Sequence, residues 1–402
     1  MPPLPRFSQS PRDAAFVQDP YPFYERARAA GPLFDWEEYG FPCAAGYREV
    51  SLLLRDRRFG REPLAGPAQE GPAHLKDFRA VDTLSMLDRE PPAHTRLRGL
   101  VLRAFTSRRI AGLEPEIGGI AADLLERLAT AEQADLIRDF AEPLPVIVIS
   151  RLLGVPDAMA PQLLAWSHAM VSMYQARRDR TIEEAANTAA REFSAWLRAL
   201  IEARRHAPAD DLLTHLIVAE SGTEHLSTEE MIATFILLLN AGHEATVHAI
   251  GNGVRTLLQV VPEPAAILGP GQIAGTCEEI LRHDPPLHLF TRIAREDVAL
   301  FGHQFRRGET VGCLLAAANR DPAVFPEPDR FLPRRRNAGA HLSFGAGIHF
   351  CLGAPLARLE LRVAIPALFA RFPKLALAAP PRFADRFHFR GVEALPSDLT
   401  RI

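Results

Sequence analysis

The feature that most constrains this fold is a long apolar run, "STEEMIATFILLLNAGHEATVHAIGNGVRTLLQV", at residues 227–260. Ser227 and Glu230 match a capping box at its start, and Pro262 follows its end. About 33 residues with a rise of about 1.5 Å each predict a helix roughly 50 Å long. Because the run is apolar on nearly every side, we expect this helix to pass through the middle of the fold.

Most of the remaining sequence also has helical periodicity. Apolar residues recur at helical spacing in residues 115–130 and 191–205, whereas strand-like patterns are short and occur near residues 297–302 and 309–317. No repeat or low-complexity linker divides the 402 residues. The sequence therefore predicts a mainly α fold with a small β region, organised as one domain over residues 1–402.

Charge and cysteine usage exclude several classes of protein. The formal net charge is −3 and no basic, aromatic-rich stretch is present, which argues against a nucleic-acid partner. The N-terminal prolines interrupt any signal peptide, and no apolar stretch is long enough to span a bilayer, so we expect a cytoplasmic protein without a membrane partner. The cysteines form no C-x-x-C pair that would indicate zinc or a dithiol: they are Cys43, Cys277, Cys313 and Cys351.

The stretch "FGAGIHFCLG", residues 344–353, combines glycines, a histidine and a single cysteine. It is a poor dinucleotide fingerprint, because Phe350 stands where the third glycine should be and no βαβ unit surrounds it. A nucleophilic cysteine with His349 as its base has no third group to orient the histidine. A buried structural cysteine requires no glycines.

A thiolate ligand to a metal cofactor explains the whole stretch. Glycines allow the backbone to pass close to a flat cofactor, where a Cβ would collide. Cys351 also precedes a long predicted helix, whose N-terminal dipole and N–H groups stabilise a thiolate. A thiolate ligand on heme iron favours cleavage of the O–O bond.

The pattern F-G-x-G-x-H-x-C-x-G at residues 344–353 resembles the heme-binding loop of the cytochromes P450. The resemblance implies that Cys351 is the iron ligand and that Phe344, Gly345 and Gly353 contribute to binding heme b, the iron protoporphyrin IX. It also implies the triangular, mainly helical cytochrome P450 fold, with the heme buried between the long helix and the cysteine loop.

Two further segments match the family in the same order. In "EEILR", Glu279 and Arg282 match its E-x-x-R pair, and Arg330 in "PEPDRF" matches the arginine that completes this buried structural network. In "HTRLR", His94 and Arg98 match residues that bind the heme propionates. The family assigns the same role to the positions of Arg292 and His349, so that four donors would face two carboxylates.

The centre of the long helix, "AGHEAT", resembles the oxygen-binding groove A-G-x-[DE]-T of the family. Small residues at Ala241 and Gly242 would leave room for dioxygen, and Glu244 matches the acid that passes protons. Ala245 stands where the family usually has a threonine, and Thr246 comes one residue later. We therefore expect proton delivery to differ here, since a rotation of about 100° separates neighbouring helix positions.

The resemblance implies a monooxygenase that inserts one atom of dioxygen into an apolar small-molecule substrate by hydroxylation or epoxidation. The chain has no flavin or iron–sulfur motif, so a ferredoxin and its NAD(P)H-dependent reductase would supply the electrons. Arginines near the cysteine loop would dock the acidic ferredoxin: Arg96, Arg103, Arg108, Arg109, Arg358 and Arg362. The expected substrate pocket is lined by Leu84, Ser85, Met86, Leu87, Leu237, Asn240, Ala241, Leu287, His288, Leu289 and Phe290.

Two alternatives remain at this point. One is a peroxide-driven peroxygenase or decarboxylase, which is disfavoured because the peroxygenases of the family carry an arginine–proline pair where Glu244 and Ala245 stand. The other is a heme sensor or binding protein without catalysis, against which the acid in the groove counts.

Overall fold

A computed structural model describes residues 3–64, 71–175, 178–218 and 225–399. The chain forms two compact units. The sheet unit comprises residues 1–64, 117–141 and 245–402, and the helical unit comprises residues 65–116 and 142–244. Among the described residues, no helix combines the length and the apolar character needed to cross a membrane.

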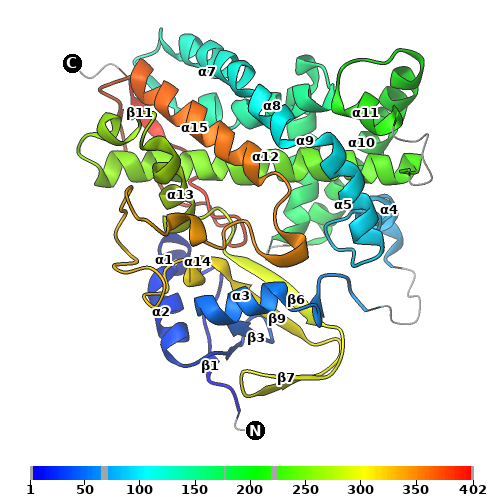
Figure 1. Cartoon of the computed structure of the whole chain (residues 1–402), viewed down its shortest axis with the longest axis vertical. Coiled ribbons are helices and arrows are strands. Elements are labelled where there is room, and N and C mark those ends of the chain that lie inside the picture. Colours follow the sequence, from blue (N-terminus) through cyan, green and yellow to red (C-terminus); the bar gives the residue numbers. More distant parts are fainter. Residues whose placement is uncertain (1–2, 65–70, 176–177, 219–224, 400–402) are drawn as a thin grey trace. The chain divides into compact units, whose positions relative to one another are not determined.

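Helix α12 (Thr228–Val260) contains 33 residues and confirms the predicted long helix. Its capping box is formed as expected, because the Ser227 N–H donates to Glu230 Oε2 at 2.9 Å and the Glu230 N–H donates to Ser227 Oγ at 3.2 Å. The helix starts in the helical unit and continues into the sheet unit as one unbroken ribbon (Figure 1). Residues 228–244 therefore belong to the helical unit and residues 245–260 to the sheet unit.

The helical unit is built around α10 (Arg180–His206), whose N-cap Asp179 accepts a hydrogen bond from the Ile182 N–H at 2.9 Å. Trp166 of α9 (Ala160–Val171) stacks on Phe193 of α10, with 5.0 Å between the ring centroids. The other helices of this unit are α4 (Lys76–Asp82), α5 (Ala93–Ala104), α6 (Ser107–Gly112), α8 (Pro143–Leu153) and α11 (Leu212–Val218), and α7 (Glu114–Leu128) leads from it into the sheet unit.

The sheet unit holds a mixed sheet with the strand order β1-β2-β3-β9-β6-β4. Its strands are β1 (Arg6–Phe7), β2 (Phe34–Trp36), β3 (Phe41–Ala44), β4 (Phe59–Gly60), β6 (Leu289–Ala294) and β9 (Thr310–Leu314). A hairpin joins β7 (Val298–Leu300) to β8 (His303–Phe305), and β10 (Ala376–Leu377), β11 (Pro396–Asp398) and β5 (Gln133–Asp135) form a smaller sheet. The helices that begin in this unit are α1 (Ala14–Gln18), α2 (Tyr21–Ala29), α3 (Tyr47–Arg55), α13 (Ile273–His283), α14 (Leu315–Ala318) and α15 (Ala354–Arg371).

Strands β6 and β9 pair antiparallel, with Arg292 opposite Val311, and their two faces pack into different apolar clusters. Phe290 packs against the cluster of Val50, Leu53 and neighbouring side chains, whereas Leu289 belongs to an aromatic cluster with Phe34. This alternation is the ordinary consequence of a pleated strand. The predicted mainly helical fold with a small β region is confirmed, and the strand patterns at 297–302 and 309–317 correspond to β7 and β9.

Candidate active site

The glycines of the cysteine loop are required by its turns and by its packing. Gly345 and Gly347 have φ values of +69° and +73°, which a residue with a Cβ rarely adopts. A Cβ on Gly347 would lie 2.4 Å from the Leu54 carbonyl oxygen of α3, and one on Gly345 would lie 3.3 Å from the Phe290 ring. Both glycines are therefore required by the turns and by the packing on α3 and β6, and their close approach to a flat cofactor stays a prediction.

Cys351 is held at the start of α15 with its side chain exposed. Its N–H donates to the Phe344 carbonyl at 2.9 Å, which closes the loop, and a Cβ on the N-cap Gly353 would lie 3.9 Å from its Sγ. Burial raises the pKa of Cys277 and of Cys313 to about 12, and it raises the pKa of Cys43 well above its usual value. An accessible thiolate at a helix N-terminus therefore fits Cys351 and none of the other described cysteines.

An arginine braces the loop from α15. Arg358 donates from Nε and Nη2 to the two oxygens of Glu278, at 2.6 and 2.8 Å, and its guanidinium lies 4.6 Å from the centroid of the Phe344 ring. Burial alone would raise the pKa of Glu278, but hydrogen bonds from Arg358 and His341 lower it to about 2. The Glu278 carboxylate is ionised at neutral pH, and it holds the positively charged Arg358 of α15 against the Phe344 ring of the cysteine loop.

The predicted propionate donors are divided between the two units. In the helical unit, His94 and Arg98 lie one turn apart on α5, with His94 buried and Arg98 partly exposed. In the sheet unit, Arg292 is buried on β6 and donates to the Thr291 carbonyl at 2.8 Å, and His349 lies in the short turn Gly347–His349 before Cys351. The joint role of the four side chains in binding propionates stays a prediction.

The E-x-x-R pair forms a fully buried network. Arg282 donates from Nε and Nη2 to the two carboxylate oxygens of Glu279, each at 2.8 Å, and both side chains are 0% exposed. The third member is Arg335, whose side chain is 4% exposed and whose Nε lies 3.1 Å from Glu279 Oε2. Three charged side chains thereby pair with one another in the core.

The prediction that Arg330 completes this network is wrong. The Arg330 side chain is 66% exposed and pairs with Glu327, whereas its carbonyl oxygen accepts hydrogen bonds from Arg282 and Arg335. Residue 330 thus contributes through its backbone, because the carbonyl that points inward leaves the side chain in solvent. The run "RRR" at residues 334–336 is the sequence feature that contains the third arginine of the network. The run does not tell which of its arginines turns inward.

One face of α12 is open where the groove motif lies. Leu237, Ala241 and Ala245, spaced four residues apart, keep exposed surface, whereas Glu244 and Thr246 are buried. A Cβ on Gly242 would lie 3.0 Å from Ile149 of α8, so this glycine serves helix packing as well as any room for dioxygen. Thr246 is only 4% exposed and lies off the open face, which makes it a poor substitute for a hydroxyl at position 245.

Of the predicted pocket residues, Leu84, Leu87, Leu287 and Phe290 are partly exposed, and Ser85 and Met86 are buried. The prediction is wrong for His288 and Leu289. His288 is 1% exposed, with Nδ1 2.8 Å from the Tyr24 hydroxyl, and burial followed by the Arg390 charge lowers its pKa to about 3. Leu289 packs into the aromatic cluster on the face of β6 opposite Phe290. Both side chains belong to the core.

Asn240 is a polar side chain beside the open face of α12. Its Nδ2 donates to the Met170 thioether at 3.9 Å, which is a weak acceptor, and its buried Oδ1 accepts no hydrogen bond from the described residues. Buried amide oxygens are nearly always hydrogen-bonded in proteins. Asn240 therefore has a buried amide oxygen without a hydrogen bond from the described residues, and its part in binding a substrate stays a prediction.

Sequence comparisons agree with this arrangement. A sequence model of the family described as "Cytochrome P450" matches residues 274–382. The polyketide biosynthesis cytochrome P450 PksS of Bacillus subtilis (strain 168) is 37% identical over 404 residues, covering 97% of this chain and 98% of the relative. The cytochrome P450 monooxygenase PikC of Streptomyces venezuelae is 38% identical, covering 95% of this chain and 91% of the relative.

Comparisons with solved structures give the same result. The structure of P450BioI in complex with an acyl carrier protein ligated to hexadec-9Z-enoic acid has a TM-score of 0.90 at 36% identity, covering 96% of this chain and 100% of that one. The epothilone D-bound cytochrome P450epoK has a TM-score of 0.91 at 31% identity, covering 98% and 100%. With the loop cysteine, the buried E-x-x-R pair and relatives that extend over the whole chain, this protein belongs to the cytochrome P450 family of monooxygenases, which bind heme b through a cysteine thiolate.

Proposed function

We propose that this cytochrome P450 inserts one atom of dioxygen into an apolar small-molecule substrate, by hydroxylation or epoxidation, with electrons from a ferredoxin and an NAD(P)H-dependent ferredoxin reductase. The single observation that carries the proposal is the accessible Cys351 at the N-terminus of α15, inside a loop braced by Arg358 and Glu278. We also propose that residues 1–402 work as one catalytic domain, which the full-length coverage of the relatives supports.

Heme b, when bound, supplies the activation of dioxygen, and each proposed role of this chain follows from a side chain. Cys351 provides the thiolate, and Phe344, Gly345 and Gly353 shape the loop beside it. His94, Arg98, Arg292 and His349 would neutralise the propionates. Leu237, Ala241 and Phe290 would exclude water from the reacting substrate, because they are apolar and keep exposed surface.

Glu244 would hold and pass the protons that oxygen reduction consumes. Its carboxylate is 7% exposed, and its Oε2 lies 3.6 Å from Nε2 of His168, a side chain that is 39% exposed. Protons would therefore enter from solvent at His168 and move to Glu244. From there the path must continue without a hydroxyl at Ala245, so we propose that an ordered water or a hydroxyl of the substrate completes it.

Replacing Ala245 with threonine is expected to increase the product formed per NAD(P)H for poorly fitting substrates, and to change it little for the natural substrate. One restored hydrogen bond of about 1 kcal/mol would shift the ratio of product to released hydrogen peroxide by about fivefold. NAD(P)H consumed, product formed and peroxide released are measured for both proteins with ferredoxin and reductase; Ala245→Ser is the smaller matched variant.

The same assay tests the function itself. Product that contains oxygen from labelled dioxygen, and that requires NAD(P)H, supports the monooxygenase. Product formed from hydrogen peroxide alone, with none formed from NAD(P)H, would instead favour the peroxide-driven alternative. No turnover with any candidate substrate class under either condition would favour a heme sensor. Equal coupling in the wild type and in Ala245→Thr across several substrates would show that proton delivery does not depend on residue 245.

The relatives indicate the class of substrate. One is named for polyketide biosynthesis and another is the 6-deoxyerythronolide B hydroxylase of Saccharopolyspora erythraea, 38% identical over 96% of this chain. The P450BioI structure contains a fatty acyl chain. We propose a polyketide or fatty-acyl substrate with a hydroxyl that donates to Asn240 Oδ1 and an apolar skeleton along Leu237 and Ala241.

Asn240→Leu is expected to weaken the binding of such a substrate by up to about tenfold, since a net hydrogen bond contributes about 0.5–1.5 kcal/mol. The shift of the heme band from low to high spin on titration gives the dissociation constant. An analogue without the hydroxyl is the control, and its affinity should not fall in the variant. Equal weakening for both molecules, or unchanged affinity and regioselectivity, would rule out the hydrogen bond.

The ferredoxin would dock on exposed arginines, whose charge can reach an acidic partner. Arg103, Arg108 and Arg362 are exposed. Arg96 is bound to Glu230 in the helical unit, and Arg358 is bound to Glu278 in the sheet unit, so neither presents its full charge to an acidic partner. We therefore propose Arg103, Arg108 and Arg362, rather than Arg96 and Arg358, as the docking residues.

A further inference from the structure

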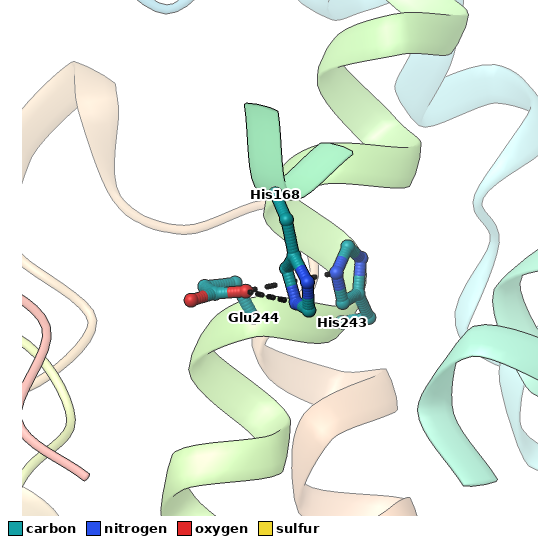
Figure 2. A group of neighbouring side chains, drawn as sticks. All are labelled: His168, His243 and Glu244. Carbon is teal, nitrogen blue, oxygen red and sulfur yellow. Dashed lines mark ion pairs between the residues drawn. The ribbon is translucent and has the colours of Figure 1, made fainter. Parts of the chain in front are cut away.

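Three side chains with ligand atoms for transition metals converge within the helical unit (Figure 2). His168 comes from α9, and His243 and Glu244 are neighbours on α12. Oε2 of Glu244 lies 3.6 Å from Nε2 of His168 and 3.7 Å from Nε2 of His243. One ligand atom from each of the three residues lies within 4.8 Å of the other two.

We propose that His168, His243 and Glu244 bind a divalent transition-metal ion, for which Zn²⁺ is the probe. Zinc takes imidazole nitrogens and carboxylate oxygens at about 2.0–2.2 Å in a tetrahedral arrangement, in which neighbouring ligand atoms are about 3.4 Å apart. The two distances to the Glu244 carboxylate are already close to this value, and the ligand atoms of the two histidines lie within 4.8 Å of each other, so side-chain rotations without a backbone shift would complete the site. Two histidines and one carboxylate leave the fourth position for water.

The surroundings favour the ligand form of His243. Its Nδ1 lies 2.7 Å from the Leu239 carbonyl oxygen, which only accepts hydrogen bonds, so Nδ1 carries the hydrogen. Nε2 then presents its lone pair toward Glu244, and the carbonyl fixes the orientation of the ring, as second-shell acceptors do in zinc sites. The His243 side chain is 4% exposed, whereas that of His168 is 39% exposed, so an ion can enter from the side of His168.

A second carboxylate approaches the same ring nitrogen of His168. Oε1 of Glu142 is 3.9 Å from His168 Nε2, and its side chain is 28% exposed. It adds negative charge at the entrance of the site and so attracts a cation. Hard cations are not expected to compete, because Mg²⁺ and Ca²⁺ require a larger set of oxygen ligands than the cluster supplies.

The bound ion would regulate the enzyme. The proposed regulation rests on the proposed function, in which Glu244 passes protons that enter at His168. An ion coordinated by both side chains blocks that path, so Zn²⁺ is expected to lower product formation and to raise the fraction of NAD(P)H lost to hydrogen peroxide. The site would make turnover sensitive to the concentration of a transition metal.

The test is calorimetric titration of the heme-loaded protein with Zn²⁺, and in parallel with Mg²⁺. One Zn²⁺ per chain is expected. His168→Ala is expected to weaken Zn²⁺ binding by at least about 100-fold, because removing a direct ligand costs more affinity than removing a residue that only hydrogen-bonds to a ligand, which costs about 10- to 100-fold. His215→Ala is the matched control: this histidine of α11 is 50% exposed and lies beside Asp210 in the same unit. Because His168 is partly exposed, its variant should fold, which the heme spectrum verifies.

The outcomes separate the two proposals. Absence of a stoichiometric Zn²⁺ site, or equal affinity in wild type and His168→Ala, overturns the metal site and leaves the proposed monooxygenase untouched. Zinc binding that depends on His168 but does not change coupling supports the site and overturns proton entry through His168 and Glu244. Zinc binding in a protein that forms no product supports the site although the proposed function fails.

Discussion

Replacing Cys351 with serine is expected to abolish the long-wavelength absorption band that a heme-thiolate protein shows when carbon monoxide binds to its reduced heme. The serine hydroxyl remains protonated at neutral pH and is a poorer electron donor than a thiolate, so the electronic signature of the ligand is lost. Product formation is expected to be lost with it. The measurement is the difference spectrum of the reduced protein with and without carbon monoxide.

Cys277→Ala is the matched control for this experiment. Cys277 is 1% exposed on α13, and burial keeps its thiol protonated by raising its pKa to about 12. This variant should retain the band at full intensity per heme. A Cys351→Ser protein that binds heme and still shows the band would contradict the assignment of Cys351 as the ligand.

Replacing Arg335 with alanine is expected to reduce the free energy of unfolding by about 3–5 kcal/mol, which is the usual cost when one partner of a buried charge network is removed. The change would leave the Glu279 carboxylate, 0% exposed, with one cationic partner, Arg282. Less heme should be retained after purification, because Glu279 also accepts the Leu332 N–H at 2.8 Å and so holds the following loop. Denaturant unfolding followed by circular dichroism gives the free energy.

Arg330→Ala provides the comparison, since the two arginines are five residues apart and only one is buried. The exposed pair of Arg330 with Glu327 should contribute less than about 1 kcal/mol. The interpretation fails if the Arg330 variant loses as much stability as the Arg335 variant.

Features carried by local patterns could be predicted from the sequence. The capping box at Ser227 and Glu230, the apolar run that follows it and Pro262 define α12 without reference to the rest of the chain. The spacing of glycines, histidine and cysteine in residues 344–353 likewise identifies the loop, because its turns and its position before a helix are local properties. These two segments were sufficient to indicate the family.

Features that depend on which side chain turns inward could not be predicted in this way. Arg330 and Arg335 carry the same charge in the same loop. The backbone carbonyl of Arg330 faces Arg282, so the Arg330 side chain points to solvent and the Arg335 side chain pairs with Glu279. His288 and Leu289 are adjacent to Phe290 in the sequence, but Tyr24 and the aromatic cluster hold them in the core.

The sequence by itself therefore determined the long helix, the cysteine loop and the E-x-x-R pair, since each is encoded within one continuous segment of the chain. Only the tertiary structure decided that Arg335 completes the buried network and that His168 meets His243 and Glu244. Those contacts join residues from different elements. They form only after the elements have packed, because burial and the pairing of charged side chains stabilise them. No local propensity or spacing encodes them.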